Sequence, residues 1–262
     1  MNINKHLILL FSVLFFLFAV SVSSGCFRKN ESDVKSVVRN ELDQLKNLDS
    51  ETTQKYIPYT ELFPDATENT DLTDEINETF SLFFRKFNYK ISDVIVGTAN
   101  HSATVSVKLT TIDSKVLARD FKAELLRTQI TESAQAQKGN IKDSSRSLEA
   151  HYLILNHLLN TNDYDTAETD CNIQLVNTGN DKKEKWKIQR TNSLEDDLVG
   201  GLIADLADPD ILSPEDTLTV YLDTLQKLDL KEMTSYLGVV NIMNTSDTAK
   251  KFHCLSTCRT DS

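Results

Sequence analysis

The chain has 262 residues, enough for one or two domains of about 150 residues each, and its 40% hydrophobic and 26% charged residues are typical of a globular protein. This composition excludes a polytopic membrane protein and a mostly disordered chain. The 28 Lys and Arg residues stand against 39 Asp and Glu, a net charge of −11, so general nucleic-acid binding is disfavoured because such a surface repels phosphate backbones.

The first 26 residues have the pattern of an export signal: a weakly basic start, an apolar stretch over 7–22, and small residues before Cys26. This segment resembles a bacterial lipoprotein signal, although Ser23 stands where that family usually has Leu. The resemblance implies that residues 1–25 are cleaved off and that Cys26 receives a diacylglyceryl anchor with acyl chains such as palmitate. The protein would then be attached to the extracytoplasmic face of the cell membrane. The alternative is an uncleaved transmembrane anchor over 7–24, which Arg28 and Lys29 disfavour.

Cleavage would leave a more acidic, lipid-tethered protein. Residues 1–25 contain one Lys and no acid, so the mature charge becomes 27 − 39 = −12. Two acyl chains on one Cys suffice for stable attachment to a membrane. The tether over 26–32 holds the folded part roughly 20–25 Å from the bilayer.

Two helices and a loop are predicted after the tether. Apolar residues recur at helical spacing from Asp33, which can serve as the N-cap. The apolar positions of this helix are Val34, Val37, Val38, Leu42, Leu45 and Leu48. A short second helix is predicted from Asp49 to Ile57, because Pro58 disfavours helical geometry in the residue before it. Residues 58–70 are predicted to form a loop.

Helical and strand patterns alternate in the rest of the chain. A helix from Thr73 carries an aromatic stripe (Phe80, Phe83, Phe84 and Phe87), for which core packing is a commoner explanation than an apolar ligand. The later predictions are a hairpin over 89–110, helices over 117–130 and 148–159, a second hairpin over 171–188, and a last helix over 194–206. This order predicts an α+β fold with an antiparallel sheet rather than a parallel, doubly wound one.

Residues 42–57 and 222–237 are similar to each other at an offset of 180. Six of these sixteen positions are identical, including the pairs Asp43/Asp223 and Tyr56/Tyr236. Leu spacing shared by any two amphipathic helices does not explain the paired Asp and Tyr residues, so the sequence favours a true repeat. Residues 213–262 are predicted to be the helical start of a truncated second repeat, beginning at Ser213 and followed by an irregular tail.

The order of these segments resembles a family of uncharacterised surface lipoproteins of Gram-positive bacteria. The resemblance rests on "LDSETTQKYI" (48–57), "FFRKFNYKI" (83–91), "ATVSVKLTTID" (103–113) and "KWKI" (185–188). Domains of this family are similar to the nuclear-transport-factor-2-like, cystatin-like cone, a bent antiparallel sheet wrapped over helices. The resemblance implies such a domain over 33–207. It implies no site residues, because this fold hosts enzymes, carriers and interaction modules alike.

The chain has no motif for phosphate or dinucleotide binding, for a serine hydrolase or for a zinc protease. We therefore predict no catalytic residue, no cofactor and no metal. His151 and His157 lie about 240° apart on one predicted helix, so they cannot share a metal, and both are interpreted as surface or capping residues. His101 is placed in a hairpin turn and interpreted as solvated.

Four other groups of polar residues have structural interpretations. The acidic stretch over 162–170 lacks the Gly and Glu of an EF-hand, which favours a solvated loop over a weak calcium site. The acidic residues around Pro209 (Asp205, Asp208 and Asp210) are interpreted as a helix end and linker. Cys171 is predicted to be a buried free thiol. Another set, His253, Cys254 and Cys258, could form a disulfide or an incomplete zinc site.

These observations favour a membrane-anchored, non-enzymatic binding module whose partner is an envelope protein, a peptide or a small apolar ligand. The alternative is a small enzyme of the cone fold, with an acid or a His in a pocket as general base.

Overall fold

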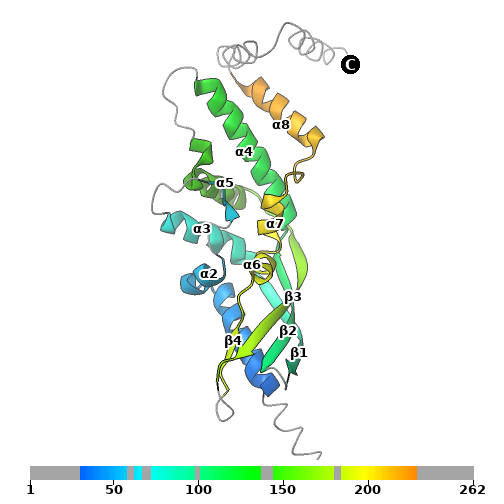
Figure 1. Ribbon diagram of the computed structural model, residues 1–262. Coiled ribbons are helices and arrows are strands. Elements are labelled where there is room, and N and C mark those ends of the chain that lie inside the picture. The colour runs from blue at the N-terminus through cyan, green and yellow to red at the C-terminus, as the bar shows by residue number, and fades with distance from the viewer. Residues whose placement is uncertain are drawn as a thin grey trace, which may run out of the picture. The chain divides into compact units, whose positions relative to one another are not determined.

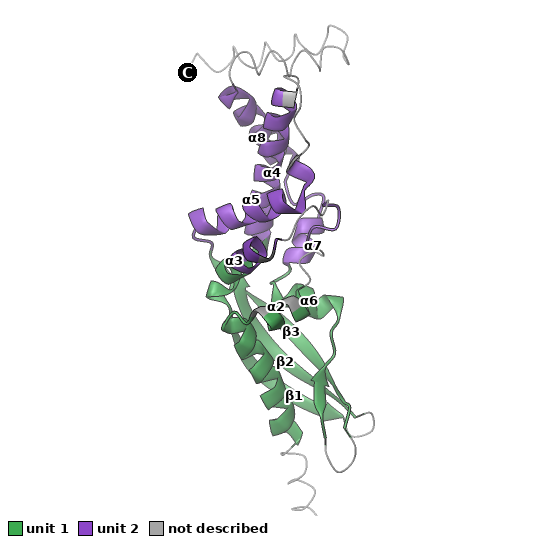
Figure 2. Ribbon diagram, turned by 90° about the vertical axis from the view of Figure 1, so that its left-hand side faces the viewer, with its two compact units in different colours: residues 1–58, 80–114, 165–201 green, residues 59–79, 115–164, 202–262 purple. Residues whose placement is uncertain are grey.

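The computed structural model describes residues 30–57, 62–66, 72–97, 101–136, 144–179 and 184–228 (Figure 1). The export-signal segment with Cys26, and the tail with His253, Cys254 and Cys258, lie outside these ranges. Within them, no helix is both long and apolar enough to cross a membrane. The chain divides into two compact units (Figure 2), of which unit 1 comprises 1–58, 80–114 and 165–201, and unit 2 comprises 59–79, 115–164 and 202–262.

Unit 1 contains a four-stranded antiparallel sheet with the strand order β1-β2-β3-β4. Its strands are β1 (Asn88–Gly97), β2 (Ser102–Ile112), β3 (Thr166–Asn177) and β4 (Trp186–Ile188). The order follows the chain, so every strand pairs with its sequence neighbour. The predicted α+β class with an antiparallel sheet is therefore confirmed.

β2, β3 and β4 alternate between buried and more exposed residues, as the period of two predicts. In β2, Val105 and Val107 are buried, whereas Ser106 and Lys108, which alternate with them, face the open side of the sheet. β1 has a bulge between Ile91 and Asp93, where its register against β2 shifts. A bulge bends and twists the strand that carries it.

The buried face of the sheet is covered by the N-terminal helix, residues 30–46 (Figures 1 and 2). Val34, Val38 and Leu45 of this helix are 0% exposed, so helix and sheet form one apolar core. The chain is already helical at residue 30, and Asp33 is therefore not the N-cap that the sequence predicted.

The short second helix and the aromatic core are as predicted. Helix α2 (Ser50–Tyr56) has Asp49 as its N-cap. The Asp49 carboxylate accepts a hydrogen bond from the Thr52 backbone N–H over 2.9 Å. The third helix is α3 (Thr73–Phe83) followed by the 3₁₀ turn η2 (Phe84–Lys86). The four Phe side chains of the stripe (Phe80, Phe83, Phe84 and Phe87) are buried, which confirms core packing.

The prediction of one continuous helix over 194–206 is wrong. The structure has α6 (Asn192–Leu198) in unit 1 and α7 (Leu202–Ala207) in unit 2. Gly200 has φ +67°, and the N–H groups of Gly200 and Gly201 bond to the carbonyls of Asp197 and Asp196. This is a Schellman motif, which ends a helix by turning the backbone into the left-handed region.

The described part of unit 2 is helical. It contains the long α4 (Ser114–Ala136), of which residues 115–136 belong to this unit, together with η3 (Ser144–Arg146), α5 (Leu148–Thr161), α7 and α8 (Pro214–Lys227). Helix α8 starts where the repeat predicts it, with Ser213 as N-cap and Pro214 in the first turn. The rest of the second copy lies outside the described residues.

Candidate ligand pocket

A pocket of about 290 Å³ lies in unit 2 beside α4, α5, α7 and the segment 62–66. Most of its wall is apolar, and three residues with charged or titratable side chains complete it. The apolar residues are Leu62, Phe63, Pro64, Ala66, Phe121, Leu125, Ile203, Leu206 and Ala207, and the other three are Asp65, Lys122 and His151. A largely apolar hollow with a few polar groups is the usual form of a small-molecule site.

Phe63 is the centre of the aromatic part of this wall. Its ring stacks on Phe121 of α4 with centroids 5.1 Å apart, and it meets Tyr152 of α5 edge-on at 5.4 Å. The His151 ring lies 4.9 Å from Phe63 and 5.7 Å from Phe121. Such pairs stabilise by about 0.5–1.5 kcal/mol beyond the burial of their area, so the cluster holds the pocket wall in one geometry.

His151 is fixed by the beginning of α5. Ser147 caps this helix by accepting the Ala150 N–H, and its carbonyl oxygen lies 2.7 Å from Nδ1 of His151. Because a carbonyl can only accept, Nδ1 must be the protonated nitrogen, and Nε2 carries the lone pair of a neutral ring.

The pKa of His151 is below its ordinary value. Burial of the half-buried ring is the main cause, and the positive charge of Lys122 adds to it, while the bond to the Ser147 carbonyl acts in the opposite direction. The ring is therefore neutral at pH 7, and it offers one hydrogen-bond acceptor beside an apolar surface.

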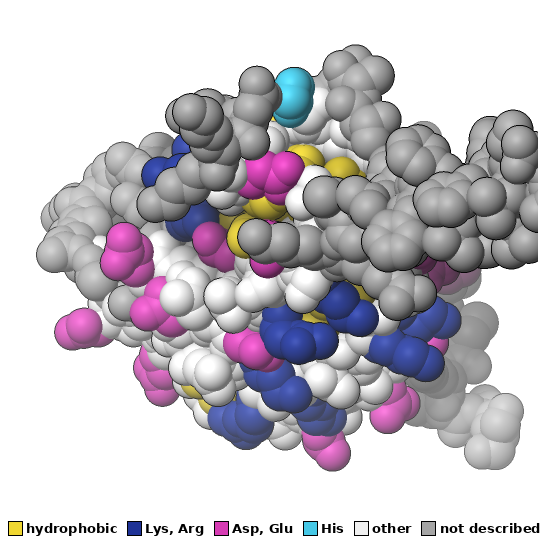
Figure 3. Space-filling view, turned by 90° about the horizontal axis from the view of Figure 1, so that it is seen from below, with side chains coloured by type: hydrophobic (Ala, Val, Ile, Leu, Met, Phe, Trp, Pro, Cys, Tyr) yellow, Lys and Arg dark blue, Asp and Glu magenta, His cyan; other side chains and the backbone are white. Residues whose placement is uncertain are grey.

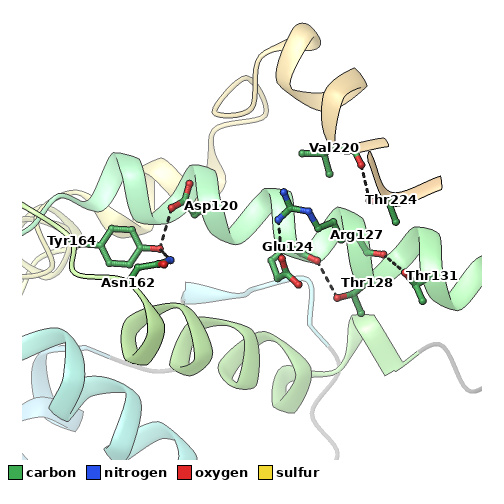
Figure 4. Close-up of polar contacts among 9 residues, drawn as sticks. All are labelled: Asp120, Glu124, Arg127, Thr128, Thr131, Asn162, Tyr164, Val220 and Thr224. Carbon is green, nitrogen blue, oxygen red and sulfur yellow. Dashed lines mark hydrogen bonds and ion pairs between the residues drawn. The ribbon is translucent and has the colours of Figure 1, made fainter. Parts of the chain in front are cut away.

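A polar contact on α4 fixes the end of α5 (Figure 4). The buried Tyr164 hydroxyl donates to Asp120 Oδ2 over 3.1 Å and accepts from Asn162 Nδ2 over 3.1 Å. Burial, the largest cause, raises the pKa of Tyr164 to about 12. Asn162 and Tyr164 thus support the framework of the helices, and neither lines the pocket.

The acidic stretch over 162–170 is divided between a short loop (162–165) and strand β3. Glu168 and Asp170 lie in β3 on the open face of the sheet, where Glu168 pairs with Lys108 over 3.1 Å. They are therefore strand residues rather than part of a solvated loop. Nowhere in the described ranges do three or more His, Cys, Asp or Glu side chains come close enough together to hold a metal ion.

The other residues singled out in the sequence lie apart from the pocket. His101 is exposed in the β1–β2 turn with φ +48°, and His157 is exposed on α5. The interpretation as surface or capping residues is right for His157, which is on the surface, whereas His151 is half-buried and contacts the carbonyl of the N-cap residue Ser147. Cys171 is a buried free thiol, as predicted, and burial, followed by the nearby Asp197 carboxylate, raises its pKa to about 12.

No pattern in the sequence indicated this pocket directly. Phe63 falls in the segment predicted to be a loop, and its partners Phe121 and His151 come from two helices far along the chain. The one available signal was the apolar pair Leu62–Phe63 inside an otherwise polar loop. Such a pair indicates that the loop is anchored to a core.

Comparison of the chain with models of protein families, with curated proteins and with solved structures found no match.

Proposed function

We propose that this protein is a lipid-anchored extracytoplasmic binding protein, and that the pocket beside Phe63, Phe121 and His151 binds a small apolar ligand. The observation that carries the proposal is the pocket of about 290 Å³ with its rigid aromatic wall. The resemblance to surface lipoproteins with cone-like domains agrees with the helix-covered antiparallel sheet of unit 1.

The size and lining of the pocket limit the ligand. Pockets that hold drug-sized molecules have volumes of about 300–1,000 Å³, so this pocket suits a ligand at the small end of that range. Apolar surface buried against Phe63, Leu125 and Leu206 would stabilise the complex by about 25 cal/mol per Å². Lys122 can attract an anionic end group, and the Nε2 atom of His151 can accept a hydrogen bond from a hydroxyl or amine. The preferred ligand is therefore an apolar molecule with one polar or anionic end group.

A pocket-filling substitution tests this proposal. Anilinonaphthalene sulfonate, an apolar probe with one anionic group, should bind the folded chain and increase its fluorescence. Ala207→Phe places a ring into the pocket from the exposed end of α7 and should weaken binding about tenfold or more.

Ala204→Phe is the matched control, because Ala204 lies on the same helix, is exposed and is not among the lining residues. It should leave the affinity of the probe within about twofold. Equal binding by wild type and Ala207→Phe, with both folded by circular dichroism, would show that the probe binds elsewhere and would overturn the pocket assignment.

The anchor is tested separately by the intact mass of the protein extracted from membranes with detergent. The expected mass is that of a chain which starts at Cys26 and carries a diacylglyceryl group. Cys26→Ala should remove the adduct and prevent cleavage at this position. A mass that corresponds to a chain starting at Met1 and carrying no lipid would contradict the lipid anchor. The protein would then be held in the membrane by its uncleaved apolar segment.

His151 also supports the second candidate, a small enzyme with a general base in this pocket. Its neutral ring is oriented by the Ser147 carbonyl, as a catalytic base requires. The only residues with charged side chains lining the pocket, among those described, are Asp65 and Lys122. A hydrolytic activity towards small apolar esters that His151→Gln abolishes, while probe binding persists, would favour the enzyme. The binding role predicts no such activity.

A further inference from the structure

A second hollow, of about 300 Å³, lies in unit 1 between the N-terminal helix and the start of β1. Its polar lining consists of Lys35, Arg39, Asp43 and Lys46 from the helix and Asn88 and Tyr89 from the strand. The three cations are four and seven residues apart, which places them on one side of the helix. We call this hollow the basic groove.

Positive charge is unevenly distributed over this acidic protein. The chain carries a net charge of −11, yet the view from below shows several Lys and Arg side chains next to one another (Figure 3). Among the described residues that line the basic groove, Asp43 is the only acid, so the lining has a net charge of 3 − 1 = +2. The groove therefore attracts anions that the surface as a whole repels.

The single carboxylate of the groove is already engaged. The Tyr89 hydroxyl donates to Asp43 Oδ1 over 2.6 Å, which joins β1 to the helix. Burial, followed by this hydrogen bond, raises the pKa of Tyr89 to about 12, so the phenol stays protonated at neutral pH. Asp43 thus fixes one wall of the groove.

The cations of the groove keep their charge available. Nζ of Lys46 donates to Asn88 Oδ1 over 2.9 Å, and this amide partner is neutral. Nowhere in the described chain does a carboxylate lie within ion-pair distance of Lys35 or Arg39. A guanidinium presents a planar pair of donors that matches two phosphate oxygens, and an ammonium adds a compact charge beside it.

The groove also lies close to the proposed lipid anchor along the chain. Three residues lie between Cys26 and residue 30, and an extended chain spans at most about 3.6 Å per residue. Arg39 lies only about 14 Å further along the helix. The chain is therefore short enough for Lys35 and Arg39 to reach the phosphate layer of a membrane that holds Cys26.

We propose that the basic groove binds the phosphate of an anionic phospholipid headgroup, with Lys35 and Arg39 as the principal contacts. This proposal rests on the proposed lipid anchor, because a membrane that holds Cys26 is the source of the phosphate. It adds a second attachment that depends on headgroup charge, whereas the acyl chains on Cys26 would hold the protein in any bilayer.

Native mass spectrometry of the full chain in a neutral detergent tests this proposal. Phosphatidylglycerol or phosphatidylcholine is added to the micelles, and the lipid adducts are counted as the lipid fraction rises. Wild type should bind phosphatidylglycerol in preference to phosphatidylcholine. Lys35→Gln with Arg39→Gln should weaken phosphatidylglycerol binding about tenfold or more, since each cation near an anionic lipid surface contributes about fivefold. The same spectrum shows whether Cys26 carries lipid, so failure of the anchor and failure of the groove are distinguishable.

Lys115→Gln with Arg119→Gln is the matched control. These two cations are also four residues apart on a helix, both are exposed, and their removal changes the net charge equally. This variant should keep the affinity within about twofold. An equal loss in both double variants would assign the binding to net charge alone and overturn the proposal. Displacement of phosphatidylglycerol by an equal concentration of inorganic phosphate would assign the groove to free phosphate and overturn the lipid source.

Discussion

The N-terminal helix and α8 are aligned by the internal sequence similarity and share a buried position, Leu45 and Leu225, yet they differ in what else they bury. Val38 of the first helix is 0% exposed under the sheet, whereas its counterpart in α8, Leu218, is 54% exposed. Helix α8 instead buries Val220 and Thr224, which point toward α4 (Figure 4) and correspond to exposed residues of the first helix, Asn40 and Gln44.

Both helices carry an apolar stripe in their sequence, and the neighbouring element decides how much of this stripe is buried. In unit 1 a sheet with Val105 and Val107 on its inner face covers most of the stripe, so that Val34, Val38, Leu42 and Leu45 are buried. In unit 2 the neighbour is α4, whose facing residues include Arg127 and Thr131 (Figure 4). A helix with such polar residues offers α8 less apolar surface than the sheet offers the first helix.

The strongest test of this comparison is one carboxylate introduced at both equivalent positions. Val38→Asp would bury an unpaired charge in the core of unit 1 and should cost about 3–5 kcal/mol of unfolding free energy or prevent folding. Leu218→Asp should change this free energy by less than about 0.5 kcal/mol, because the side chain is mostly in solvent.

Urea unfolding measures both effects. The only Trp of the chain, Trp186, lies buried in β4 and reports on unit 1 through its fluorescence, and far-UV circular dichroism reports on all helices. A comparable loss of stability in the two variants would mean that the Leu218 stripe is covered in solution, and the contrast between the copies would fail.

A second substitution tests how closely the end of α6 packs against β2 in unit 1. A Cβ atom at Gly200 would lie well inside van der Waals contact with Oγ1 of the buried Thr111, and φ is +67° there. Gly200→Ala should therefore cost about 2–4 kcal/mol, measured by urea unfolding with Trp186 fluorescence.

Thr111→Ala with Gly200→Ala separates the two causes of this loss. Removing the hydroxyl and methyl of Thr111 relieves the clash and leaves the backbone strain, so the double variant should lose less than the sum of the single losses. Strictly additive losses would place the whole cost of Gly200→Ala in its backbone conformation.

Local features of the sequence predicted local features of the fold, and contacts between distant segments could not be predicted. The caps Asp49 and Ser213 mark their helices because a side-chain oxygen bonds within three residues. Gly200 and Gly201 were overlooked because apolar spacing continues across them, although two adjacent Gly residues are a helix-end signal. The pocket depends on Phe63 meeting Phe121 and His151, and neither composition nor periodicity carries such information.

The smallest expected effect concerns His151, the polar centre of the helical unit. Its pKa is lower in the folded state than the ordinary 6.5, mainly because of burial, so the unfolded chain binds more protons between these two values. The contribution of His151 to stability should therefore be fully present above pH 6.5 and decrease as the pH falls from 6.5 through the lowered folded pKa.

His151→Gln should remove this part of the acid sensitivity, whereas His157→Gln, on the exposed side of the same helix, should retain it. The measurement is the free energy of unfolding in urea at about pH 7.5 and about pH 5, followed by far-UV circular dichroism. If His151→Gln loses as much stability between these two conditions as wild type does, the ring is not buried in its neutral form, and the pocket wall built on it is more open than the structure describes.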